Sequence, residues 1–355
     1  MYFIGIDQHK QYSHMTVLDE SGREIKAGHV ANMRDEIESF LEGMCQNAQG
    51  VVEAGRACYV VTDILWDLGV KMIIAHPYQV KAIAKARIKN DKRDSRILAH
   101  LLRTGMIPEV YQRTPSNRQA QRILRLRAFY TRSLTQVKNK IWSLLAQQTQ
   151  EVRMEVDKRG NIFSGKGLEF LDALEFEDKE ILVSLLKTYR HLAERRKESD
   201  RLVKTLYQQI EEARLIDTVP GFAVTLSVLV AVELADINRF KRPEELHSYA
   251  GLIPSTRSSA DKTYHGRITK QGNKMLRWAV VEAVYPAIQK DHDLLVFYKK
   301  IARRRGANIA KVATAKRLLT IIYKICKEKR CYIPYKRNEN RLPIRHTNGL
   351  KQAAL

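Results

Sequence analysis

The chain has 355 residues, 44% of them hydrophobic, so it is long enough to bury a core and to form two or more domains. Its first residues lack an apolar stretch long enough for a signal peptide, and no apolar run reaches the roughly 18 residues of a membrane span, so we expect a soluble, cytoplasmic protein. The formal net charge of +23 indicates a polyanionic partner.

The positive charge is concentrated toward the C-terminus. Lysine and arginine exceed aspartate and glutamate by 1 over residues 1–115, by 5 over residues 116–213 and by 17 over residues 214–355. A protein that neutralises a phosphate backbone shows such an asymmetry, because each contacted phosphate needs a basic side chain. The distribution therefore predicts nucleic-acid binding.

The four cysteines do not have the spacing of a zinc site. They lie far apart or outside a C-x-x-C pattern, and no histidine cluster accompanies them. We expect free thiols at Cys45, Cys58, Cys326 and Cys331.

Residues 1–115 have the pattern of a mixed α/β domain. Apolar and alternating segments predict strands at 2–7, 13–19, 23–30, 50–55 and 70–76. Helical periodicity predicts helices at 33–44, 60–68, 78–87 and through 97–102. Three strands, a helix and then alternating strands and helices follow the element order of the ribonuclease-H-like fold.

The last of these helices opens with two aspartates in a basic setting, KNDKRDSR. In one interpretation Asn90 or Asp91 caps the helix and Asp94 favours its dipole. In the other, the carboxylates of Asp91 and Asp94 lie on one side of the helix and share a divalent cation.

Residues 116–213 have a different sequence pattern, that of long helices. Long, charge-rich segments with leucine spacing, 118–147 and 174–213, flank a glycine-bearing loop at 156–167. This pattern predicts an antiparallel helical hairpin or coiled-coil arm that serves as a spacer or a dimerisation element. The first half is rich in arginine and could also lie on nucleic acid, through Arg118, Arg122, Arg125, Arg127 and Arg132, of which Arg122 and Arg125 are the selected candidates.

Residues 214–331 predict a mostly helical domain. The segment LIDTVPGFAVTLSVLVAVEL reads as a helix end, a Pro-Gly turn and an apolar helix, close to a helix-hairpin-helix that offers backbone N–H groups to phosphate. A polar loop without periodicity is expected at 253–274, then basic helices at 275–290 and 302–330. Residues 332–355 read as a basic tail.

Four carboxylates form a candidate metal site. Asp7 ends the first predicted strand and Glu53 the fourth, so in neighbouring strands they would emerge together, with Asp91 and Asp94 supplied by the helix on that face. Acidic groups crowded in this way repel one another unless cations neutralise them. Two Mg²⁺ ions would suit in-line phosphoryl transfer.

Motifs along nearly the whole chain resemble those of DEDD transposases of the insertion-sequence 110 family, which is related to Piv-type DNA invertases. The motifs are FIGIDQHK, VVEAGR, KNDKRDSRILAHLL, TVPGFAVTLSVLVAVEL, FKRPEELHSYAGLIPS and RSSADKTYHGRITKQGNKMLR. The resemblance implies a RuvC-like domain at 1–115, a coiled-coil arm at 116–213 and a C-terminal transposase domain at 214–331. It places the catalytic, metal-binding acids at Asp7, Glu53, Asp91 and Asp94.

The resemblance also implies a serine nucleophile in the C-terminal domain. The family's serine, five places after the proline of the Gly-Leu-x-Pro pattern, corresponds to Ser259, with Ser258 as the alternative. A serine hydroxyl is a poor nucleophile without a metal or a base, so the acidic site would have to act together with it. Nearby phosphate contacts are predicted at Lys262, Arg267, Lys270, Lys274 and Arg277, with Arg303, Arg304 and Arg305 further on.

These features predict a recombinase of a mobile element, in a prokaryotic cell and associated with the nucleoid. The family resemblance implies donor and target DNA, a noncoding guide RNA from the element and a homodimer or homotetramer as partners. One alternative is a RuvC-like junction nuclease in which water attacks the phosphodiester. The other is a nucleic-acid-binding protein whose acidic site has decayed.

Overall fold

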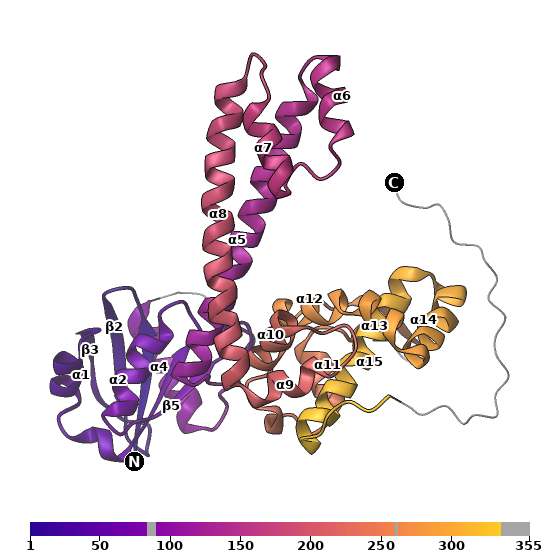
Figure 1. Cartoon of the computed structure of the whole chain (residues 1–355). Helices are drawn as coiled ribbons and strands as arrows, with labels where there is room; N and C mark the ends of the chain where they lie inside the picture. The colour runs from indigo at the N-terminus through magenta and orange to yellow at the C-terminus, as the bar shows by residue number, and fades with distance from the viewer. Residues whose placement is uncertain (84–89, 260–261, 335–355) are drawn as a thin grey trace. The chain divides into compact units, whose positions relative to one another are not determined.

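The computed structural model describes residues 1–83, 90–259 and 262–334 (Figure 1). The chain divides into two compact units, Met1–Thr114 and Pro115–Leu355.

The first unit is built on a six-stranded mixed sheet with the order β3-β2-β1-β4-β5-β6. The strands β1, β2 and β3 are antiparallel, β1, β4 and β5 are parallel, and β6 is antiparallel to β5. The bounds are Tyr2–Gln8 for β1, Tyr12–Leu18 for β2, Glu24–Ala31 for β3, Ala48–Glu53 for β4, Lys71–Ala75 for β5 and Glu109–Val110 for β6. The predicted mixed α/β arrangement is confirmed, and the short β6 is an addition to it.

Helices cover both faces of this sheet. They are α1 (Arg34–Leu41), the 3-10 helix η1 (Met44–Asn47), α2 (Cys58–Asp67), α3 (Pro77–Ile83) and α4 (Asp91–Arg103). The helix predicted at 33–44 ends at Leu41, because Glu42 and Gly43 take left-handed φ angles of 40° and 79° that an α-helix cannot continue through.

Side chains of β1 alternate between two apolar clusters, as the pleat requires. Ile4 and Ile6 belong to the cluster that contains side chains of α1 and α2. Phe3 packs in the cluster that contains Val51 of β4 and Leu98 of α4. By the same alternation Asp7 of β1 and Glu53 of β4 lie on the sheet face covered by α4.

The second unit begins with a long helical hairpin. The helices α5 (Pro115–Ala146) and α8 (Lys179–Gln209) run side by side in opposite directions (Figure 1). Two further helices, α6 (Gln150–Lys158) and α7 (Gly165–Ala173), lie at the far end and share a small core with them. The predicted hairpin is present, but the loop expected at 156–167 is shorter, because α6 runs to Lys158 and Ser164 caps α7 by accepting a hydrogen bond from Gly167 N.

The remainder of the second unit is mostly helical and surrounds the apolar helix α10, whose residues from Ser227 to Leu234 are all buried. The elements are α9 (Glu211–Asp217), α10 (Val224–Leu234), η2 (Ile237–Arg239), α11 (Pro243–Tyr249), β7 (Pro254–Ser259), β8 (Lys262–Ile268), α12 (Lys274–Glu282), α13 (Val284–Lys290), α14 (His292–Arg305) and α15 (Ala307–Glu328).

Three predictions for this part were wrong. The segment expected to be an irregular loop contains the antiparallel hairpin β7–β8, because cross-strand pairing was not visible in its polar sequence. The helix predicted at 275–290 is two helices that meet at Ala283. The helix predicted at 302–330 is interrupted at Gly306, whose φ of 85° ends α14 before α15 begins.

Two bulk predictions can be compared directly with the structure. The four cysteines are free thiols, as predicted. Within the described residues, no helix combines the length and the apolar character needed to cross a bilayer.

Candidate functional site

The position of α4 over the sheet depends on a glycine. A Cβ atom on Gly5 of β1 would lie 1.9 Å from the Ser95 carbonyl oxygen and 2.4 Å from the Ala99 nitrogen. Both distances are shorter than a Cβ can tolerate, so only glycine lets the backbone of α4 approach β1 this closely. This close approach brings the first turn of α4 to the end of β1.

Buried hydrogen bonds fix α4 against the second strand as well. Ser95 Oγ lies 2.9 Å from His14 Nδ1 and 2.8 Å from Thr16 Oγ1, and all three side chains are buried. Burial is the main reason that the pKa of His14 is lowered, which keeps its ring neutral and able to share these bonds. The helix therefore has one rotational setting over β1 and β2.

The cap of α4 is made by Asn90. Its Oδ1 accepts a hydrogen bond of 3.2 Å from Lys92 N. Of the two capping residues that the sequence allowed, Asn90 is the N-cap, and Asp91 is the first residue of the helix. Asp94 lies in the same first turn, where its charge suits the helix dipole.

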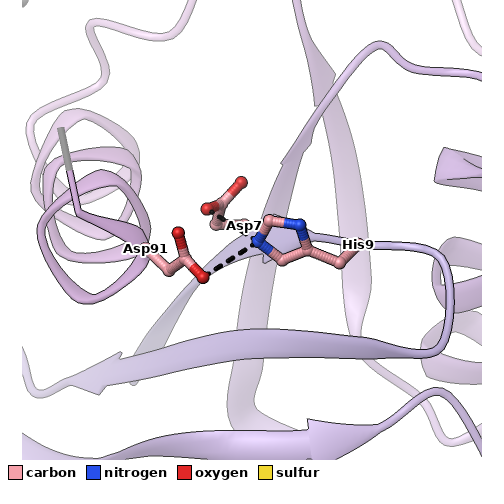
Figure 2. Close-up of side chains that lie close together, drawn as sticks. All are labelled: Asp7, His9 and Asp91. Carbon is pink, nitrogen blue, oxygen red and sulfur yellow. Dashed lines mark ion pairs between the residues drawn. The ribbon is translucent and has the colours of Figure 1, made fainter.

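Three side chains converge where β1 ends and α4 begins: Asp7, His9 and Asp91 (Figure 2). His9 Nε2 lies 3.0 Å from Asp91 Oδ2 and 3.5 Å from Asp7 Oδ2, and the three donor atoms lie within 4.8 Å of one another. Asp7 and Asp91 are 28% and 38% exposed, so the cluster is reachable from solvent.

The electrostatics of Asp7 fit a cation site. Its pKa is raised mainly by burial and further by the nearby charges of Asp91 and Asp94, while His9 opposes the rise. A bound cation would relieve both causes, since it stabilises the ionised carboxylate. Two carboxylates and an imidazole are also a donor set that divalent metals accept.

The other two predicted acids lie nearby but outside this cluster. Ile6 pairs with Val52 on the parallel strands β1 and β4, so Asp7 and Glu53 are the next residues on neighbouring strands. Asp94 is close enough to raise the pKa of Asp7. Among the residues that the structure describes, however, the group of donor atoms within 4.8 Å comprises Asp7, His9 and Asp91 alone.

The predicted nucleophile belongs to the hairpin β7–β8. Ser259 is the last residue of β7 and pairs with Lys262, while Ser258 pairs with Thr263. Residues 260–261, and the side chains of residues 256–265, lie outside what the structure describes. The backbone register thus places Ser259 at the end of β7, with Lys262 opposite on β8.

Most of the predicted phosphate-binding residues whose side chains are described are exposed. Arg277 differs, because its guanidinium donates a hydrogen bond of 2.8 Å to the Ala250 carbonyl and so holds the end of α11. The exposed residues are Arg122 and Arg125 on α5, Arg267 on β8, Lys270 in the next loop, Lys274 on α12, and Arg303, Arg304 and Arg305 at the end of α14.

His9 is a member of the cluster that was not predicted. The signal was available, because residues 7 and 9 near the end of a strand point to the same face. The predicted ligand set contains four carboxylates and no imidazole.

Comparison with known proteins points to one group. Residues 4–149 match a family of transposases of the IS110 DEDD type. Residues 213–299 match the family described as "Transposase IS116/IS110/IS902 family".

Individual relatives span most of the chain. The transposase for insertion sequence element IS1111A of Coxiella burnetii is 22% identical over 337 residues, which are 93% of this chain and 90% of the relative. The transposase for insertion sequence element IS1328 of Yersinia enterocolitica is 22% identical over 90% of this chain and 95% of its own length. The putative transposase y4qE of Sinorhizobium fredii is 25% identical over 80% of this chain and 71% of its own length.

Proposed function

The chain belongs to the IS110 family of DEDD transposases, and on that premise we propose that it cuts and rejoins DNA using a metal site in its first unit and Ser259 in its second. The observation that carries the proposal is the convergence of Asp7 and Asp91. These residues are far apart in sequence, yet both carboxylates reach the same His9 nitrogen.

The first unit would have a ribonuclease-H-like, RuvC-like fold. Support comes from the strand order β3-β2-β1-β4-β5, the antiparallel β2 beside β1, and the helix α4 over the face that carries Asp7. In this interpretation Glu53 and Asp94 complete the metal site, with Glu53 entering from the strand next to β1. The ion would be Mg²⁺ or a similar divalent cation, and a pair of ions would use all four acids.

In the proposed reaction Ser259 attacks a DNA phosphodiester. The bond from Ser259 Oγ to phosphorus forms, the bond from phosphorus to one deoxyribose oxygen breaks, and that oxygen leaves with a proton while the serine proton passes to solvent or a base. A divalent cation, when bound, supplies Lewis-acid stabilisation of charge on the phosphate oxygens. Because the phosphodiester energy is retained in the phosphoserine link, strands can be rejoined without ATP.

The proposed nucleic-acid partners are inferred from the family and from the net positive charge of the chain. Donor and target DNA are implied by a transposase, and we propose that an element-encoded guide RNA selects them. The exposed basic residues of α5, α12 and α14 are suited to phosphate backbones. We further propose that the hairpin of α5 and α8 acts as a coiled-coil arm in a dimer or tetramer, and that the protein works at the nucleoid of a prokaryotic host.

The test uses the full-length protein with RNA transcribed from the DNA that flanks its gene, Mg²⁺ or Mn²⁺, and labelled junction DNA on a denaturing gel. We expect a slowly migrating, protease-sensitive DNA band that is absent with Asp7→Ala and Ser259→Ala. The control Asp67→Ala removes an exposed carboxylate that pairs with Arg34, and it should keep the band.

The alternatives give different gels. Ser258→Ala losing the band while Ser259→Ala retains it would move the nucleophile to Ser258. Free cleaved ends that Ser259→Ala still produces would favour a water-using junction nuclease. DNA and RNA binding without any metal-dependent cleavage would indicate a decayed site.

A further inference from the structure

We propose that His9 is a protein ligand of the divalent cation, so that the site is a mixed nitrogen and oxygen site that prefers Mn²⁺ to Mg²⁺. This inference rests on the proposed function, because it assumes that Asp7 and Asp91 hold a cation. It adds a ligand that the four-acid pattern lacks and a preference that four carboxylates alone would not produce.

The backbone at His9 is held in place by the neighbouring strands. His9 N donates a hydrogen bond of 2.9 Å to Tyr12 O, and Asn32 Nδ2 donates one of 3.0 Å to His9 O. Asn32 is fixed in turn, since Ser13 Oγ donates to its Oδ1 and its own backbone N–H donates to Gln11 O. The turn between β1 and β2 therefore presents the imidazole from a defined position.

The ring is aimed at the carboxylates. Its centroid lies 4.8 Å from that of Tyr12, with the two planes inclined by 31°, so Tyr12 supports one side of the ring. The edge that carries Nε2 faces Asp91 and Asp7 (Figure 2). The Nε2 atom is shielded from solvent and has no partner with hydrogen-bond geometry.

The spacing of the donor atoms suits adjacent positions around an octahedral ion. With metal–ligand bonds of about 2.1 Å, neighbouring ligand atoms in an octahedron are about 3 Å apart and opposite ones about 4.2 Å. The distances of 3.0 Å and 3.5 Å from His9 Nε2 to the two carboxylates fall in this range. A neutral ring with its proton on Nδ1 would offer the Nε2 lone pair to the ion.

The donor set determines which ion is favoured. Mg²⁺ prefers oxygen ligands and retains water, whereas transition-metal ions accept imidazole more readily. Mn²⁺ combines a tolerance for carboxylates with a tolerance for nitrogen. Replacing one oxygen donor with an imidazole should therefore shift the preference toward Mn²⁺.

A protonated His9 would behave differently. It would be a counterion for Asp7 and Asp91, and a metal would have to displace its charge. Removing it would then strengthen metal binding instead of weakening it, so the two roles of His9 predict effects of opposite sign.

The experiment measures Mn²⁺ bound to the full-length protein by pulsed EPR, together with competition by Mg²⁺. We expect nitrogen modulation from a directly bound imidazole in the wild type. The control His29→Ala should retain it, because the ring of His29 contacts Tyr12 and His14 rather than the carboxylates. The modulation should disappear in His9→Ala and His9→Asp. The ratio of the Mg²⁺ dissociation constant to the Mn²⁺ dissociation constant should fall roughly tenfold in His9→Asp. This variant supplies an oxygen ligand in place of the imidazole, so it tests the preference between the two ions without removing a ligand.

Three outcomes would overturn the inference. Mn²⁺ binding that depends on Asp7 but shows no nitrogen modulation in the wild type would reject His9 as a ligand while leaving the proposed function intact. Tighter Mn²⁺ binding by His9→Ala would identify His9 as a counterion, again with the function intact. Binding of neither ion in an Asp7-dependent manner would reject the metal site itself, and with it this part of the proposed function.

Discussion

The two units of the chain carry charge in contrasting ways. Residues 1–114 contain 15 basic and 14 acidic side chains, whereas residues 115–355 contain 47 basic and 25 acidic ones. A cation site and a surface for a polyanion need electrostatic fields of opposite sign. An acidic cluster on the nearly neutral unit would avoid the repulsion that a strongly basic surface would exert on the proposed metal ion.

The units also differ in how they hold their candidate catalytic groups. Asp7 and Asp91 are placed by a sheet and by a helix that packs directly on it through Gly5. Ser259 is placed by a two-stranded hairpin, an element with little stability of its own. A rigid frame therefore fixes the proposed metal ligands, and a two-stranded hairpin presents the proposed nucleophile.

The largest effect is expected at the helix contact in the first unit. Gly5→Ala should lower the free energy of unfolding by about 3 kcal/mol or more, because the new Cβ meets backbone atoms of α4 that cannot rotate away. Urea unfolding followed by circular dichroism measures this. The control Gly55→Ala meets only the Glu53 carbonyl at 3.8 Å and should be close to neutral. Equal effects at both glycines would contradict the close packing of α4.

Asparagine caps in the two units offer a matched comparison. Asn273 caps α12 and also donates to Glu233 Oε2 at 2.7 Å, whereas Asn90 caps α4 at an exposed position. Asn273→Ala should lower the free energy of unfolding by about 2 to 3 kcal/mol and Asn90→Ala by about 1 kcal/mol, because only Asn273→Ala also removes a hydrogen bond to a buried carboxylate. Unfolding titrations of both variants test this order. Restoration by Asn90→Ser but not by Asn273→Ser would support it, because serine replaces the cap alone.

The second unit should lose stability in mild acid through His247. Burial, aided by Lys316 and opposed by Glu244, lowers the pKa of His247 to about 4. Between pH 6.5 and 4 the unfolded chain binds a proton that the folded protein excludes, so stability falls as pH falls through this window. Between pH 7 and pH 5 the free energy of unfolding should fall by about 2 kcal/mol. His247→Gln should remove this part of the slope, and His191→Gln at an exposed arm position should leave it unchanged.

The smallest effect concerns the basic surface. Arg303→Ala, Arg304→Ala and Arg305→Ala combined should raise the DNA dissociation constant about tenfold near 0.15 M salt and flatten the salt dependence, because phosphate contacts release fewer counterions. Fluorescence anisotropy over a salt series gives both quantities. The same loss of three charges from the first unit, with Arg23, Lys71 and Lys81 replaced by alanine, should have less effect. Equal effects would show that net charge alone governs binding.

The sequence was sufficient for regular, locally encoded features of the fold. The strand at Tyr2–Gln8, the buried strand at Ala48–Glu53 and the long helices α5 and α8 follow from hydrophobic periodicity. The hairpin β7–β8 was missed because its strands are stabilised by pairing with each other, which a polar sequence does not reveal. The interruption at Gly306 was missed because a single glycine can either be tolerated in a helix or end it.

For the candidate site, the sequence could place single residues on elements but could not bring their atoms together. The parallel register puts Asp7 and Glu53 at equivalent ends of β1 and β4, as the pattern suggested. The approach of Asp91 depends on the contact between Gly5 and the α4 backbone, a tertiary feature without a local signature. The roles of the four acids and of Ser259 stay predictions.

The site is divided in sequence, and this has a consequence for synthesis of the protein. The strands β1, β2 and β3 are consecutive neighbours and can pair as soon as they leave the ribosome. Asp91, in contrast, belongs to α4, which can settle over Gly5 only after the preceding strands β4 and β5 have been made. A prematurely terminated chain that lacks α4 therefore cannot assemble the cluster, and a nascent chain can bring Asp7, His9 and Asp91 together only once α4 has been made.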